Sequence, residues 1–127
     1  MATTPLQEPT FFILTALAEQ PRHGYGVIQE VAELSDGRVK LRPGTLYGAI
    51  DRLGEQRWIE VDHEEVVDGR LRRYYRLTED GATALRAESE RLRANAEAAT
   101  RRLAARAKTA GRGPASASPG FARWALT

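Results

Sequence analysis

The stretch RPGTLYGAIDRLGEQRW, residues 42–58, decides how this chain folds. Its apolar residues recur at intervals of three and four, which is the spacing of one stripe along an α-helix. Pro43 is favourable in the first turn of a helix, so the helix is expected to begin there. The stripe that should face a core consists of Leu46, Ala49, Ile50 and Leu53.

The opposite face of this predicted helix is small and hydroxyl-bearing, and it is basic near the N-terminus. Short side chains permit close approach, and the free amides of a helix N-terminus attract phosphate. These properties suit a helix that enters the major groove of DNA. An ordinary amphipathic surface helix is the alternative that the stretch by itself leaves open. The residues of this face are Thr45, Tyr47, Gly48, Asp51, Arg52 and Glu55.

Two more helices are expected before this stretch. The first runs from about Thr10, a candidate N-cap, to Glu19, and it ends before Pro21 because a residue that precedes proline avoids the helical region. The second runs roughly from Tyr25 to Leu34 and ends in the turn sequence Ser-Asp-Gly. Three short helices joined by tight turns predict a helix-turn-helix.

Two strands are expected after the central stretch. Residues 58–62 alternate between apolar and polar, and residues 71–77 form the return strand. The apolar residues of the two strands fall on the same face of the hairpin only if the loop contains an odd number of residues. This favours a three-residue loop, Asp68–Arg70, over a two-residue loop at the Asp-Gly pair. The three-residue loop would place Val61 opposite Leu77 and Glu65 opposite Arg73. A hairpin is marginal alone in water, so this one is expected to pack on the helices as a wing.

Basic residues begin late in the chain. The net charge is only +2, and residues 1–37 hold a single basic side chain. The later cations gather around the central helix and the hairpin tip, as a polyanion-binding surface requires. Acidic residues occupy the same region, so two alternatives remain. The charges form an ordinary solvent-exposed surface of mixed sign, or the arginines of the hairpin keep its exposed edge from pairing with another chain. The candidate phosphate contacts are Lys40, Arg42, Arg52, Arg70, Arg72 and Arg73.

A long helix is expected after the wing, over residues 79–108, with Thr78 as its N-cap. A helix of about 28 residues is about 42 Å long at 1.5 Å per residue, which is too long to be covered by a small core. A second copy of the chain is therefore the expected partner, although a solvated single helix stays open. A twofold dimer would also present two DNA-binding helices about one turn of the duplex, roughly 34 Å, apart. The candidate dimerisation residues are Leu85, Leu92, Ala96, Ala99 and Leu103.

The remaining residues, 109–127, are rich in Gly, Pro and Ser and predict a flexible tail, which ends in an apolar hexad at Phe121–Leu126. The chain has no cysteine, and no apolar run approaches the roughly 18 residues of a membrane span. We therefore expect a cytoplasmic protein without disulfides. Its domains are expected at residues 1–78, 79–108 and 109–127.

Catalytic and metal sites are not expected. The two histidines are His23 and His63, and only Glu65 would share a strand face with His63, which is too few ligands for a catalytic metal. Motifs for phosphate-binding loops or activated nucleophiles are absent from the sequence. We expect a protein that is not an enzyme and carries no cofactor.

Four motifs occur in order along the chain, namely His23-Gly24-Tyr25-Gly26, Pro43-Gly44-Thr45-Leu46-Tyr47, Arg52-Leu53 followed by Trp58-Ile59, and Gly69-Arg70 followed by Arg73 to Thr78 with Gly81 after it. Together they resemble the PadR family of bacterial winged-helix transcriptional regulators. They occur in the family's order and spacing over about residues 10–82. Gly48 departs from the pattern, since many relatives have proline there, and Gly54 is a poor helix former by about 1 kcal/mol relative to alanine.

The resemblance implies a dimer, usually a repressor, whose third helix and wing bind a palindromic operator. Tyr25, Gly44, Thr45, Leu46 and Tyr47 correspond to positions near DNA. The single C-terminal helix resembles the short branch of the family. A small hydrophobic or phenolic ligand near the dimer interface is also implied, with Trp58 as the aromatic residue to examine and core packing as its alternative role.

Two functions therefore remain open from the sequence. The first is sequence-specific binding of double-stranded DNA by a homodimer, in a mainly α-helical winged helix-turn-helix fold. The second is a winged-helix module whose basic helix binds an acidic protein and which has no operator.

Overall fold

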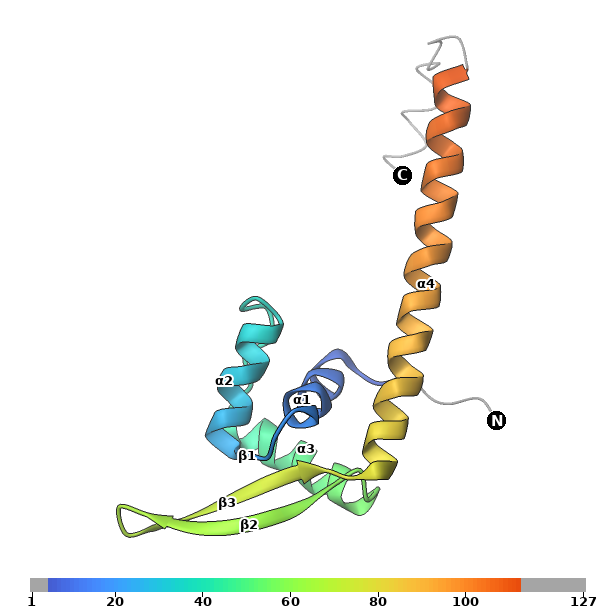
Figure 1. Ribbon diagram of the computed structural model, residues 1–127. Coiled ribbons are helices and arrows are strands. Elements are labelled where there is room, and N and C mark those ends of the chain that lie inside the picture. Colours follow the sequence, from blue (N-terminus) through green and yellow to red (C-terminus); the bar gives the residue numbers. More distant parts are fainter. Residues whose placement is uncertain (1–4, 113–127) are drawn as a thin grey trace. The chain divides into compact units, whose positions relative to one another are not determined.

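The computed structural model describes residues 5–112, and at residues 111 and 112 it describes only the backbone. The chain divides into two compact units, residues 1–90 and residues 91–127, which we call the first unit and the second unit. The first unit contains three short helices, a three-stranded sheet and the beginning of the last helix (Figure 1). It is the mainly helical winged helix that the sequence predicted.

The three short helices are α1 (Glu8–Ala18), α2 (Gly24–Leu34) and α3 (Pro43–Glu55). Helix α3 begins at Pro43 as predicted, and its apolar stripe is buried. Helix α1 begins earlier than predicted, with Gln7 at the N-cap position and a proline in its first turn. The prediction that Thr10 caps α1 is therefore wrong, because proline is favoured in a first turn and the helix has already begun at Thr10.

The sheet contains β1 (Arg22–His23), β2 (Ile59–Val67) and β3 (Arg70–Leu77) in the antiparallel order β1-β3-β2. The closed end of the β2–β3 hairpin extends past the helices of the first unit, as a wing does (Figure 1). Strand β1 lies in the link between α1 and α2 and was not predicted. Its pairing with β3 attaches the wing to the beginning of α2.

The turn of the hairpin contains two residues, so the predicted three-residue loop is wrong. Arg70 is already the first residue of β3, paired with Val67. Asp68 and Gly69 have φ angles of 52° and 77°, in the left-handed region. Both central residues of a type I′ turn have positive φ, and this turn fits the right-handed twist of two strands better than ordinary turns do.

A bulge at Asp62 restores the parity of the hairpin. The register shifts between Val61 and His63, so Asp62 is an extra residue with no register partner on β3. The extra residue therefore lies within β2 and not at the turn. Apolar residues consequently meet across the strands near the core despite the short turn. The observed pairs are Ile59 with Leu77, Val61 with Tyr75, and Glu65 with Arg72, in place of the predicted pairs of Val61 with Leu77 and Glu65 with Arg73.

The last helix, α4, spans Glu79–Arg112. Its N-cap is Thr78 as predicted, because the hydroxyl of Thr78 accepts a 3.0 Å hydrogen bond from the backbone N–H of Gly81. The helix continues past residue 108, so residues 109–112, which the sequence assigned to the tail, are helical. The rest of the predicted tail, including the hexad Phe121–Leu126, lies outside the described residues. In the part of the chain described here, no helix is both long and apolar enough to cross a bilayer.

Gly81 explains how α4 starts against the rest of the first unit. A Cβ atom at Gly81 would collide with the carbonyl oxygen of Trp58 and would lie 2.8 Å from a methyl group of Leu77. The residue that weakens the first turn by propensity is thus required for close packing of α4 on the sheet.

The core of the first unit is formed by apolar side chains from all three short helices and from the sheet. Leu85 of α4 packs partly buried against it, as does Trp58. The fully buried side chains of this core include Ile13 and Leu14 of α1, Val27 and Val31 of α2, Leu46 of α3 and Ile59 of β2.

Candidate nucleic-acid interface

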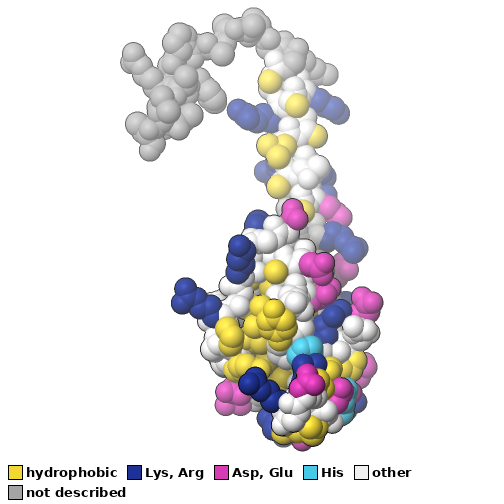
Figure 2. Space-filling model, turned by 90° about the vertical axis from the view of Figure 1, so that its left-hand side faces the viewer, with side chains coloured by type: hydrophobic (Ala, Val, Ile, Leu, Met, Phe, Trp, Pro, Cys, Tyr) yellow, Lys and Arg dark blue, Asp and Glu magenta, His cyan; other side chains and the backbone are white. Residues whose placement is uncertain are grey.

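A hollow of about 840 Å³ lies between the beginning of α2, the beginning of α3 and the wing. It brings together five residues that the sequence singled out for DNA contact: Tyr25, Tyr47, Arg70, Arg72 and Arg73. They come from three separate elements, so the fold and not the chain order makes them neighbours. Figure 2 shows the molecule from this side, with basic, acidic and apolar side chains intermixed on the first unit.

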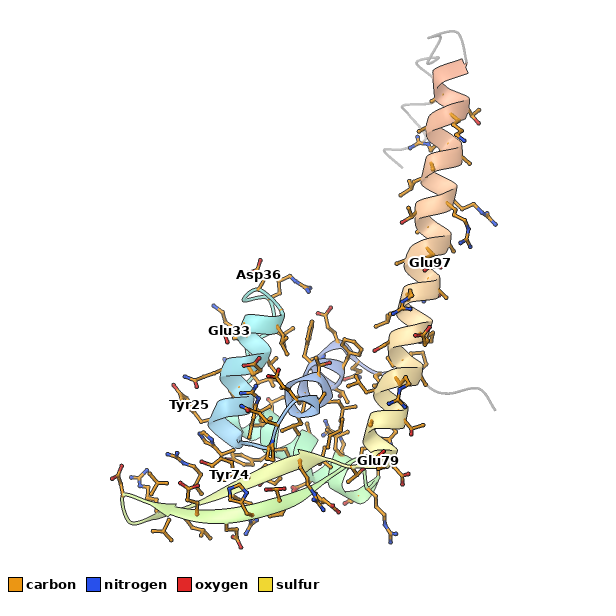
Figure 3. All side chains as sticks on the ribbon, in the orientation of Figure 1. Tyr25, Glu33, Asp36, Tyr74, Glu79 and Glu97 are labelled. Atoms are coloured by element: carbon orange, nitrogen blue, oxygen red, sulfur yellow. The ribbon has the colours of Figure 1, made fainter. Side chains whose placement is uncertain are left out.

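Two tyrosines expose their phenol groups at this hollow. Tyr25 is 64% exposed and Tyr47 is 48% exposed. Tyr25 projects outward from the first turn of α2 (Figure 3). An exposed phenol offers an apolar ring together with a hydroxyl that both donates and accepts hydrogen bonds. Such groups can contact either base edges or phosphate.

The exposed residues just before Tyr47, in the first turn of α3 and the segment that leads into it, do not line the hollow. Lys40, Arg42, Gly44 and Thr45 are all solvent-exposed. Arg42 occupies the N-cap position and its side chain makes no capping hydrogen bond. The first amides of α3 are therefore not capped by that side chain, and the helix dipole makes this end favourable for an anion.

Leu46 does not belong to the exposed surface, so the structure does not support the prediction that it contacts DNA. Its side chain is completely buried in the core. Its backbone N–H is also occupied, because it donates a 2.9 Å hydrogen bond to the carbonyl oxygen of Arg42. The motif places Leu46 between two exposed neighbours, yet helical periodicity turns it to the inner face of α3.

Arg52 and Trp58 lie at a different, smaller hollow of about 210 Å³. Arg52 is exposed, and Trp58 is half-buried against the core. The structure therefore separates Arg52 from the arginines of the wing. The other lining residues come from the N-terminal segment, α1 and α3, namely Pro5, Leu6, Gln7, Thr10, Ala49, Leu53 and Gln56.

The arginines of the wing differ in their partners. Arg73 forms an ion pair with Glu64 at 3.4 Å, and Arg76 pairs with Glu60. Within residues 5–112, no carboxylate lies at ion-pair distance from Arg70 or Arg72. These two cations are consequently the better candidates for phosphate contacts.

The arginines of the wing also lie on different faces of the sheet. Side chains alternate along a strand, so Arg70, Arg72 and Arg76 share one face of β3. Arg73 lies on the other face with Leu71 and the buried Tyr75. The three arginines that the sequence grouped, Arg70, Arg72 and Arg73, thus line one hollow but project from the two faces of β3.

Tyr75 lines the main hollow and was not identified from the sequence as a functional residue. It is only 8% exposed, and burial raises the pKa of its hydroxyl, whereas the charge of Arg73 and a hydrogen bond with it act to lower that pKa. Tyr47 opposes this lowering, which places the two tyrosines within electrostatic reach of each other. Alternation in β3 was the signal that could have identified Tyr75 as an inward-facing residue.

Three aromatic rings line up across the strands on the other face of the sheet. The ring of Tyr74 stacks on His63 with centroids 4.4 Å apart, and it meets His23 at 5.3 Å. Burial lowers the pKa of His23 and the charge of Arg72 lowers it further, with Glu65 opposing both. His23 also lines the main hollow. The sequence did not reveal this row because β1 was not predicted.

The acidic residues near His63 do not complete a metal site. The Nδ1 atom of His63 lies 2.6 Å from Asp62, and its Nε2 atom lies 3.9 Å from Glu65. Among the side chains that the structure describes, no group of three His, Asp or Glu residues is arranged to hold a metal ion.

The predicted dimerisation residues fall into two groups. Leu85 packs against the core of its own unit, so its proposed role in dimerisation is not supported. Leu92 is 40% exposed and Leu103 is 63% exposed, and Ala96 and Ala99 are also exposed. These four residues recur at intervals of three and four along α4, which places them on one side of the helix.

Comparison with known proteins relates the chain to regulators of transcription. Residues 13–87 match the Transcriptional regulator PadR-like family. The transcriptional regulator Rv3488 of Mycobacterium tuberculosis is 41% identical over 101 residues, which cover 80% of this chain and 88% of that protein.

Solved structures of regulators share the fold. A PadR family transcription regulator from Clostridium difficile superposes with a TM-score of 0.61 at 24% identity, over 76% of this chain and 99% of that one. PadR of Bacillus subtilis, solved in complex with operator DNA, superposes with a TM-score of 0.57 at 17% identity, over 64% of this chain and 47% of that one.

Proposed function

The chain belongs to the PadR-like family of transcriptional regulators, and on that premise we propose that it is a repressor that binds a palindromic DNA operator as a homodimer. Members of this family act as regulators and not as enzymes, in agreement with the lack of a catalytic constellation in the sequence. The observation that carries the proposal is the hollow that gathers Tyr25, Tyr47, Arg70 and Arg72 beside the N-terminus of α3.

The exposure and charge of the side chains indicate which residues contact bases and which contact phosphates in the proposed complex. Helix α3 enters the major groove with Thr45 and Tyr47, whose side chains are exposed and can reach base edges. Arg42, Arg70 and Arg72 bind phosphates, which fix the position of the protein without reading sequence. The complex of B. subtilis PadR with operator DNA supports this proposal, because it shows a protein of the same fold bound to DNA.

The proposed dimer forms through the second unit. Leu92, Ala96, Ala99 and Leu103 give α4 one weakly apolar side that a second copy can cover. A twofold dimer would require the same residues from both copies, and it would match the symmetry of a palindromic operator. Leu85 is left out of this interface because the core of its own unit already covers it.

The proposed effector is a small hydrophobic or phenolic molecule. The hollow beside Trp58 has apolar walls from Pro5, Leu6 and Leu53 but encloses only about 210 Å³. It is smaller than the roughly 300–1,000 Å³ of ordinary ligand pockets. A ligand there would have to be no larger than a single substituted ring, or the N-terminal segment would have to move.

Selection of bound sequences from random duplexes tests the proposed function. We expect an enriched inverted repeat that the wild-type chain binds about 10³-fold or more tightly than scrambled DNA at moderate salt. Enrichment of no sequence, together with capture of an acidic protein by the same basic surface, would instead establish the alternative of a protein-interaction module.

A further inference from the structure

The two units of the chain carry opposite net charge. Residues 1–90 contain 11 Lys and Arg against 16 Asp and Glu, whereas residues 91–127 contain eight Lys and Arg against one Asp or Glu. The winged-helix unit is thus net acidic, although it contains the proposed reading surface. The surplus of positive charge lies in the second unit.

The cations of the second unit are exposed along α4. Arg101, Arg102, Arg106 and Lys108 are all solvent-exposed. Among residues 5–112, none of these four side chains has a carboxylate at ion-pair distance. Along the last turns of α4 the charged side chains visible in Figure 2 are basic. The one acidic residue of the second unit is Glu97, labelled in Figure 3.

Two of the four basic side chains lie on the side of α4 opposite the apolar stripe. At 3.6 residues per turn, Arg101 and Lys108 lie opposite Leu92 and Leu103. Arg102 and Arg106 are one turn apart and lie on the same flank of the stripe, with Arg106 beside Ala99 at its edge. Dimerisation through the stripe would therefore leave most of this basic face in solvent.

The composition of the helix favours a nucleic acid over a lipid surface as its partner. A helix that lies in a membrane interface buries Trp, Phe or Leu on its apolar side. The apolar side here has two leucines and is otherwise alanine, including Ala96 and Ala99. That side gives little apolar area for insertion, whereas several cations close together on one helix suit the phosphates of a duplex.

We propose that the basic face of α4, formed by Arg101, Arg102, Arg106 and Lys108, is a second contact with DNA that binds the phosphate backbone of a duplex without reading its sequence. This inference rests on the proposed function in one respect, since DNA must be the physiological polyanion. This basic face supplies a long-range attraction to DNA, which the first unit does not supply because its net charge is negative.

The test measures the salt dependence of binding to a duplex of scrambled sequence by fluorescence anisotropy, with the full-length chain. The variant Arg101→Gln/Arg102→Gln/Arg106→Gln should bind more weakly at low salt. The slope of log K against log salt should fall by about 1 for each arginine that contacts a phosphate. The variant with Lys at the same three positions should keep the wild-type slope.

The matched control is Ala98→Gln/Ala104→Gln/Ala105→Gln, which introduces the same side chains on the same helix away from the stripe and leaves every cation in place. It should bind scrambled DNA like the wild type. Sedimentation of all variants reports whether the oligomeric state is preserved, and a loss of affinity confined to variants whose oligomeric state has changed would overturn the inference.

The outcomes separate this inference from the proposed function. An unchanged slope in the triple Gln variant overturns the inference even if an operator is found. Loss of slope with no enriched operator sustains the inference and defeats the proposed function. A slope that responds only with anionic vesicles or only with duplex RNA, and not with duplex DNA, also overturns it.

Discussion

The phenol oxygen of Tyr47, on α3, lies 2.5 Å from the position that a Cβ atom on Gly24 of α2 would occupy. Two more atoms of the Tyr47 ring lie within 3.3 Å of the same position. The first turn of α2 can therefore hold only glycine at residue 24 while Tyr47 keeps its place. A contact between two helices thus fixes where the side chain of the proposed reading helix points.

Replacing Gly24 with alanine should displace Tyr47. We expect Gly24→Ala to weaken operator binding but to lower the free energy of unfolding by no more than about 1 kcal/mol, the low end of the cost of overpacking, because the clashing phenol belongs to a half-exposed side chain that can move. Adding Tyr47→Phe removes the closest atom and should restore part of that stability. Chemical denaturation of the single and double variants measures the coupling. The control is Gly54→Ala, where a Cβ meets no atom within 4 Å and the helix should gain up to about 1 kcal/mol.

The arginines of the wing should differ in their effect on DNA binding. Arg72→Gln should reduce the salt slope of operator binding by about 1, because Arg72 has no carboxylate partner within residues 5–112. Arg76→Gln is the control on the same face of the same strand, since Arg76 pairs with Glu60. Binding titrations at several salt concentrations compare the two, and equal slopes would show that the wing does not bind phosphate through Arg72.

Substitutions at two neighbouring residues of α3 should have different effects, one on stability and the other on DNA binding. Leu46→Ala empties a completely buried position and should cost about 2–5 kcal/mol of unfolding free energy. Thr45→Ala, at an exposed position, should change stability by no more than about 0.5 kcal/mol but should weaken operator binding. Denaturation and binding curves on both variants check this. If folded Leu46→Ala lost only operator discrimination, at unchanged stability, Leu46 would be a contact residue after all.

The stability of the fold should depend on pH through His23. The pKa of His23 is lowered in the folded protein, chiefly by burial, from the ordinary value of 6.5. The unfolded chain therefore binds the proton more readily than the folded chain, and stability must fall as the pH drops below about 6.5 toward the folded pKa. The variant His23→Gln should show a smaller decrease over the same window.

Nuclear magnetic resonance can follow the two histidines directly, because the sequence contains only His23 and His63. In Arg72→Gln the pKa of His23 should rise, since the charge of Arg72 helps to lower it. A titration of His23 that does not respond to this substitution would remove Arg72 as a cause.

The helices and the existence of the wing followed from periodicity, because an amphipathic helix or strand repeats its pattern over many residues. Strand β1 has only two residues, Arg22 and His23, and so shows no period at all. Because β1 could not be predicted, neither the row of rings around Tyr74 nor the position of His23 at the hollow could be predicted.

The hairpin shows that alternation in the sequence counts an odd residue but does not locate it. Alternation correctly required one odd residue in the hairpin, but parity does not say where along the strands it lies. The turn at Asp68 and Gly69 keeps two residues, and the bulge falls at Asp62. Likewise the resemblance placed Leu46 among DNA-binding positions, whereas its own apolar stripe had already assigned it to the core.

The pairing along the wing limits how its length can change. Adding one residue to each strand, between Val66 and Val67 and between Arg70 and Leu71, would turn the end of the hairpin over, so that Arg70 would come to lie on the face of Leu71. Adding two residues to each strand would keep every side chain on its face and would only lengthen the wing. Natural or engineered insertions that preserve the reach of this wing toward a groove should therefore come in even steps per strand.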